Sequence, residues 1–154
     1  MNPHPLPSHK GFAILEALIA VFVLSVGLLG VAALQASALR NNQSALERSL
    51  AVMQSYAIFD AMRANTDAMR AGSYNMGWTC TPPSGGTLAQ NDRRQWITDI
   101  QAALNDPAAC GRIACTPAGV CTVEVRWDDS RGGVLTGTQT SGSTVETVTT
   151  VSQL

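Results

Sequence analysis

The chain has 154 residues, of which 45% are hydrophobic and only 14% are charged, and its formal net charge at neutral pH is −1. A chain of this length suits one domain with an added membrane element. A net charge so close to zero gives no bulk electrostatic attraction to nucleic acid or acidic lipid, so we expect no nucleic-acid partner.

A long apolar segment lies near the N-terminus. No charged residue occurs from Ala17 to Leu39, and a helix of this length can cross a hydrocarbon core of about 30 Å. Glu16 directly precedes the segment, and a carboxylate deep in lipid costs roughly 2.5 kcal/mol or more. A plain anchor leaves Glu16 unexplained unless its side chain snorkels to the interface. A cleaved secretory signal could end at residues 36–38, but the apolar run exceeds the roughly 7–15 residues of a signal core.

The residues around Glu16 resemble the N-terminal signature of type IV prepilins, in which Gly11 and Phe12 are followed by Glu16. The resemblance implies that prepilin peptidase removes residues 1–11 and that the new amino terminus, on Phe12, is methylated. Glu16 then becomes the fifth residue of the mature chain, where the family's glutamate is understood to pair with the N-terminal amine in the filament. An opposite charge offsets part of the cost of a carboxylate in apolar surroundings. The amine can belong to the same chain, or to a neighbour whose register the pair would then set.

The apolar segment continues into an amphipathic one, because no proline or glycine lies between Val31 and Gly72. We predict one helix from about Phe12 to about Asn65, with its second half packed on a globular head. Two adjacent apolar stripes are expected to face the head, namely Leu39, Leu46, Leu50, Met53, Ala57, Ala61 and Ala64, and beside them Val52, Tyr56, Phe59 and Met62. The polar residues that fall outside these stripes are Arg40, Glu47, Arg48 and Gln54.

The rest of the chain predicts a small head. Residues Met69–Ala89 are rich in Gly, Pro, Ser and Thr and indicate a loop. Residues Asn91–Asn105 indicate a short helix that Asn91 or Asp92 could cap and that ends at Asp106-Pro107.

Three segments of the head predict strands. These are Ile113–Cys115 and Val120–Trp127, joined by a turn at residues 116–119, and a final strand within Thr144–Leu154. Apolar and polar residues alternate in Val120–Trp127, which is typical of a half-buried antiparallel strand. We therefore expect a sheet of three or four strands laid against the long helix.

All four cysteines lie in the C-terminal half, at Cys80, Cys110, Cys115 and Cys121. This pattern fits two disulfides in an oxidising compartment. Cys115 and Cys121 flank the tight turn and could bridge the hairpin, leaving Cys80 to pair with Cys110, while Cys110 with Cys121 is the alternative. The cysteine spacings match no common zinc pattern, and in a head with a modest core the disulfides are expected to matter.

Catalytic chemistry has little support in the sequence. Both histidines, His4 and His9, precede the expected cleavage point, so the mature chain would lack a histidine base or histidine metal ligand. We expect Asp128-Asp129 to lie in a solvated loop and Arg93-Arg94 on an exposed helix face. No glycine-rich phosphate loop occurs, and the aromatic residues are not interleaved with basic ones as single-stranded nucleic acid requires. We therefore expect no enzymatic activity, no metal site and no cofactor.

Further stretches narrow the resemblance to minor pilins of the type IV pilus modification protein (PilV) family. They are FDAMRAN at 59–65, GSYN at 72–75 and VRWDD at 125–129. The resemblance implies an α+β pilin-like fold with a cleaved leader at 1–11, a transmembrane or filament-core half of the helix at 12–39, and a periplasmic head at 40–154.

The same resemblance implies a function in assembly. The precursor would cross the inner membrane once and later join the extracellular pilus. Its partners would be prepilin peptidase, other minor pilins, the major pilin and the inner-membrane assembly platform. A place in the complex that starts the pilus or forms its tip would connect the chain with adhesion and twitching motility. A minor pseudopilin of type II secretion shares the N-terminal signature, and a pilus-borne adhesin or DNA-uptake module is the alternative from another functional class.

Overall fold

The computed structural model describes residues 10–130 and 145–154, with side chains described from Ile14 onward. Its contacts divide the chain after Leu39 into two compact units, residues 1–39 and 40–154. The helix α1 (Lys10–Ala64) begins in the first unit and ends in the second. The predicted long helix is therefore confirmed, and it ends one residue before Asn65.

The described part of the first unit, residues 10–39, is an apolar helix. From Ile14 onward the large apolar side chains of this unit are exposed, Phe22 to 69% and Leu34 to 73%. Among the described residues, α1 is the helix that is long and apolar enough to cross a membrane, judged by length and composition.

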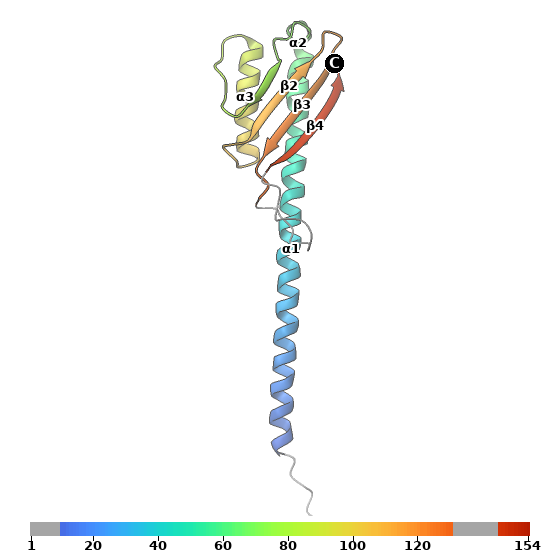
Figure 1. The fold of residues 1–154 in the computed structure, drawn as a ribbon, viewed down its shortest axis with the longest axis vertical. Coiled ribbons are helices and arrows are strands. Elements are labelled where there is room, and N and C mark those ends of the chain that lie inside the picture. Colours follow the sequence, from blue (N-terminus) through green and yellow to red (C-terminus); the bar gives the residue numbers. More distant parts are fainter. Residues whose placement is uncertain (1–9, 131–144) are drawn as a thin grey trace, which may run out of the picture. The chain divides into compact units, whose positions relative to one another are not determined.

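The second unit, the head, is an α+β domain with a four-stranded antiparallel sheet (Figure 1). After α1 come the following elements: α2 (Thr66–Arg70), β1 (Met76–Thr79), α3 (Leu88–Ala103), β2 (Cys110–Cys115), β3 (Val120–Trp127) and β4 (Glu146–Gln153). The strands lie in the order β1-β2-β3-β4, and every neighbouring pair is antiparallel. The fold class expected from the sequence is confirmed.

The core of the head forms between one face of the sheet and the two longer helices. In β3 the residues Cys121, Val123, Val125 and Trp127 are buried, as their alternation predicts. Gly111 of β2 lies so close to α3 that a side chain there would overlap the ring of Trp96. Because glycine has no Cβ, this position lets the helix approach the sheet closely.

The predicted loop 69–89 is wrong in three places. It contains the end of α2 and all of β1, and α3 begins at Leu88. The cap of α3 is Thr87, whose hydroxyl accepts from the N–H of Gln90 while the Gln90 side chain accepts from the N–H of Thr87. This reciprocal capping box is a recognised helix start, and it places the beginning of α3 before the predicted caps Asn91 and Asp92. On the other side of α3, β2 begins at Cys110, earlier than the predicted Ile113.

The side of α1 that faces the head also differs from the prediction. Leu46 and Met53 of the first predicted stripe are 58% and 64% exposed, whereas Phe59 and Met62 of the second are buried. The buried residues of α1 are Glu47, Ala51, Ser55, Ile58, Phe59 and Met62. The prediction is therefore right for Phe59 and Met62. It is wrong for Leu46, Met53 and Tyr56, because this part of α1 is apolar on two sides and the head covers only one of them.

Two carboxylates predicted outside the core are buried within it. Glu47 is 6% exposed, and its Oε2 accepts a hydrogen bond of 3.1 Å from Nε1 of Trp127. Asp129 is also 6% exposed, and its Oδ2 accepts a bond of 2.7 Å from Oγ of Ser44. The expectation of a solvated Asp129 is therefore wrong, because this side chain ties the end of β3 to α1.

Candidate functional site

The first candidate residue is Glu16, which lies on the exposed helix of the first unit. Its neighbours on the helix surface are Leu15, Ile19 and Ala20, and its side chain is exposed. Within the described part of the chain, no hydrogen bond or ion pair reaches its carboxylate. Phe12 lies on the same helix four residues earlier, and its side chain is outside the described set. A charge at this point of an apolar helix needs a partner from elsewhere when lipid or other helices surround it.

The second candidate is an exposed apolar surface on α1 within the head. We call Leu46, Met53, Ala57 and Ala64 the outer stripe; all four are exposed, and they lie on the opposite side of the helix from the buried Ser55 and Met62. Leu50, at the margin of the stripe, is half-buried against the core. With Leu50 included, the spacings are four, three, four and seven residues, which is the heptad spacing by which helices pack on one another.

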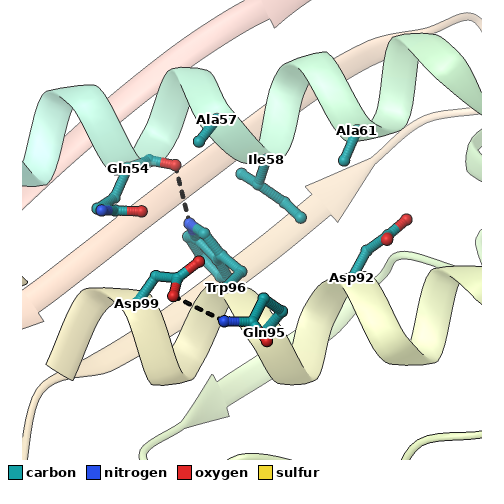
Figure 2. A pocket seen from close by; sticks show the side chains of 8 residues that line it. All are labelled: Gln54, Ala57, Ile58, Ala61, Asp92, Gln95, Trp96 and Asp99. Carbon is teal, nitrogen blue, oxygen red and sulfur yellow. Dashed lines mark hydrogen bonds between the residues drawn. The ribbon is translucent and has the colours of Figure 1, made fainter. Parts of the chain in front are cut away.

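A groove between α1 and α3 lies beside this stripe. Figure 2 shows its lining, which is Gln54, Ala57, Ile58, Ala61, Asp92, Gln95, Trp96 and Asp99 around a volume of about 150 Å³. The Nε1 of Trp96 donates to the main-chain oxygen of Gln54 at 2.9 Å, which joins the two helices. The Nε2 of Gln95 donates to Oδ1 of Asp99 at 2.8 Å. The α1 side of the groove is apolar except for Gln54, and the α3 side carries two carboxylates, Asp92 and Asp99.

One end of α3 is fixed by a buried tyrosine. Tyr74 donates a hydrogen bond of 2.5 Å to Oδ2 of Asp92 and accepts one of 3.3 Å from Nδ2 of Asn65. Burial, together with the hydrogen bond to Asp92, raises the pKa of Tyr74 to about 12. The hydroxyl is therefore neutral at physiological pH, and it joins the end of α1 to α3.

The stretches that carry the family resemblance mostly make contacts within the head. In FDAMRAN, Asp60 and Arg63 form an exposed ion pair at 2.8 Å, and Asn65 binds Tyr74 of GSYN. In VRWDD, the buried Trp127 binds Glu47 on α1. The sequence did not predict the bond between Trp127 and Glu47, because these two residues lie 80 positions apart in the chain.

The cysteines form two disulfides, Cys80–Cys110 and Cys115–Cys121. The second crosses the hairpin of β2 and β3, where Cys115 and Cys121 face each other. The first ties the segment after β1 to the start of β2. The alternative pairing of Cys110 with Cys121 is not formed.

The candidate metal ligands and the two adjacent arginines were also located in the described part of the chain. From 14 to 130 and from 145 to 154, no three metal-ligating side chains come together. Arg94 is exposed, as predicted, while Arg93 is half-buried and donates to the main-chain oxygen of Asn75 at 3.1 Å. His4 and His9 lie outside the described residues.

Comparisons with known proteins add no relative. No protein-family model matches the chain, and neither a curated protein nor a solved structure matches it.

Proposed function

We propose that the chain is a minor pilin of the type IV pilus system and that it acts in pilus assembly. The observation that carries this proposal is the uncovered apolar surface of α1. The large apolar side chains of residues 14–39 are exposed, and within the head the outer stripe is exposed as well. Apolar surface of this extent is covered by lipid or by other helices in a working protein. The long N-terminal helix of a pilin is surrounded by lipid before assembly and by neighbouring helices after it, so both environments would cover this surface.

The signature residues have definite roles in this proposal. Cleavage after Gly11 leaves a methylated amine on Phe12, and this amine pairs with the carboxylate of Glu16 in the filament. The pair removes an isolated charge from apolar surroundings and fixes the register between subunits when the amine comes from a neighbour. Its two charges have to lie on helices that approach each other closely.

Small residues along the helix suit that close approach. Apart from the helix backbone and the adjacent residues, a Cβ added at Gly27 or Gly30 would meet no described atom within 4 Å, so contacts within the described chain do not require glycine at either position. Glycine and alanine at a membrane-helix surface let neighbouring backbones come near. The small residues in this part of the helix are Ala13, Ala17, Ala20, Gly27 and Gly30.

The proposal also gives the chain a route and a set of partners. The precursor crosses the inner membrane once with its head in the periplasm, where the disulfides form. Prepilin peptidase cuts it, and the assembly platform brings it together with other minor pilins and with the major pilin. Its place at the start or tip of the pilus then connects it with adhesion and twitching motility.

A deletion strain tests the proposal against its alternatives. We expect loss of surface pili without the gene, recovery on complementation, and the mature chain in pili sheared from the complemented cells. Normal pili with lost attachment or DNA uptake would support a binding module instead. Normal pili with a defect in protein secretion would support a pseudopilin.

A further inference from the structure

The two edges of the head's sheet are built differently. At one edge, β1 has four residues, and its register against β2 shifts between Met76 and Thr79. Before β1 begins, the Asn75 side chain accepts from the N–H of Cys115 on β2 at 2.7 Å and donates to its C=O at 3.2 Å. A short, irregular edge that is partly closed by a side chain resists pairing with another strand.

The opposite edge is formed by β4, the last strand in the order of the sheet (Figure 1). All eight residues of β4 pair with β3 in an unbroken register, from Trp127 opposite Glu146 to Val120 opposite Gln153. The strand contains no proline, glycine or lysine, and five of its eight residues are Thr or Val. Its one charged residue, Glu146, already pairs with Arg48 at 3.1 Å. A long, regular edge of this kind, whose single charge is already paired, is a template for another strand.

The register identifies the main-chain groups that point away from the sheet. The N–H of Leu154 donates to the C=O of Gly119 on the β3 side at 2.9 Å. Because main-chain groups alternate along an antiparallel strand, Ser152 and Thr150 also point to β3. The residues with outward N–H and C=O groups are therefore Thr147, Thr149, Val151 and Gln153, and the same four have exposed side chains. Among the described residues, no hydrogen bond reaches these outward groups.

We propose that the outer edge of β4 receives a β-strand from the head of a different protein of the prepilin class. This inference rests on the proposed function and names the kind of contact by which the head joins a partner. The incoming strand bonds to the outward groups of Thr147, Thr149, Val151 and Gln153 and extends the sheet. Its side chains beside Thr149 and Val151 are uncharged and β-branched or small, because those on β4 are Thr and Val.

The geometry favours a different chain over a second copy. Two β4 strands from two copies could pair in antiparallel fashion around Thr149, and their outward N–H and C=O groups would then match. In that pair, however, the two heads point in opposite directions. Two chains anchored side by side in one membrane carry their heads in the same direction. If the two β4 strands were instead parallel and related by a two-fold axis along the strands, Thr149 would lie opposite its own copy. The two side chains would then point to opposite faces of the sheet, whereas residues directly opposite each other in a sheet point to the same face. The contact is therefore between unlike surfaces.

Amide hydrogen exchange on the full chain in detergent tests this inference. The probes are the other prepilin-class proteins encoded in the same gene cluster, each purified as a full chain and added in excess. In the free chain we expect fast exchange at Thr147, Thr149 and Val151 and slow exchange at Thr150. One probe should slow exchange at the three outward amides by at least about tenfold and leave Thr150 nearly unchanged.

Matched variants separate the edge from general stability. Thr149→Pro removes only an outward N–H, so its thermal midpoint should equal that of Thr149→Val. The probe should no longer slow amide exchange in Thr149→Pro, but it should still do so in Thr149→Val. Thr150→Pro removes an N–H that bonds to β3 and should lower the midpoint. If Thr149→Pro lowers the midpoint as much as Thr150→Pro does, the assignment of outward groups is wrong.

The remaining outcomes are equally decisive. Slow exchange at the outward amides of the free chain, or protection by no probe, would overturn the inference. Protection by excess unlabelled copies of the chain itself would show a homodimer and overturn the choice of partner. The proposed function is tested separately, by whether the chain is present in sheared pili. Absence from pili counts against that function, whereas presence with an unprotected β4 counts against the edge contact alone.

Discussion

The buried hydroxyl of Tyr74 makes the stability of the head depend on alkaline pH. In the folded head the pKa of Tyr74 is raised to about 12, against an ordinary value of about 10 in the unfolded chain. Below pH 10 the hydroxyl is neutral in both states, and its full contribution to stability is present. As pH rises from 10 to 12, the unfolded chain loses this proton first, so the free energy of unfolding falls, by about 1–2 kcal/mol after discounting for solvent screening of a hydroxyl in part-buried hydrogen bonds.

The variant Tyr74→Phe isolates this effect. At pH 7 the variant should be less stable by about 1–2 kcal/mol, because it loses the hydrogen bonds to Asp92 and from Asn65. The difference between wild type and variant should then shrink steadily from pH 10 to pH 12, because only the wild type has a hydroxyl to ionise at this position. Urea unfolding followed by circular dichroism at a series of pH values measures that difference. A difference that stays constant from pH 9 to pH 12 would refute the reasoning.

Three further changes have definite expected outcomes. Gly11→Ala should leave most of the chain unprocessed, because the peptidase needs close backbone approach there; immunoblots that show normal processing would contradict this. Glu16→Ala should be processed normally but recovered in sheared pili at a small fraction of the wild-type amount, whereas equal recovery would remove the charge-pair argument. Replacing both Cys80 and Cys110 by serine should lower the free energy of unfolding by about 3–4 kcal/mol, since the disulfide closes a loop with a separation of 30 residues. A loss below about 1 kcal/mol in urea unfolding would argue against that value.

Local patterns in the sequence predicted most of the elements. The long helix follows from an apolar run that passes into an amphipathic one without a breaker, and β3 follows from its strict alternation. The start of α3 was predictable but missed, because Thr87 and Gln90 have the spacing of a capping box. β1 was harder to predict, since four residues that include Gly77 carry almost no alternation signal.

The surfaces that meet in the head could not be predicted in the same way. Helical periodicity finds apolar sides of α1, but it does not say which side a sheet will cover when two are apolar. The burial of Glu47 and Asp129 depends on Trp127 and Ser44, which lie about 80 residues away from them in the chain. For Glu16 the sequence supplied the hypothesis, and the structure adds that the described part of the chain offers its carboxylate no partner.

The most direct test of the account is the mass of the N-terminal peptide of the protein isolated from its own cells. The account predicts a chain that begins at Phe12, with one methyl group on its amine. A chain that keeps residues 1–11, or one that begins at Leu39 after a secretory cleavage, would contradict it. In the first case Glu16 would have no processed amine to pair with, and in the second Glu16 itself would have been removed, so the proposal of a pilin spine would fail.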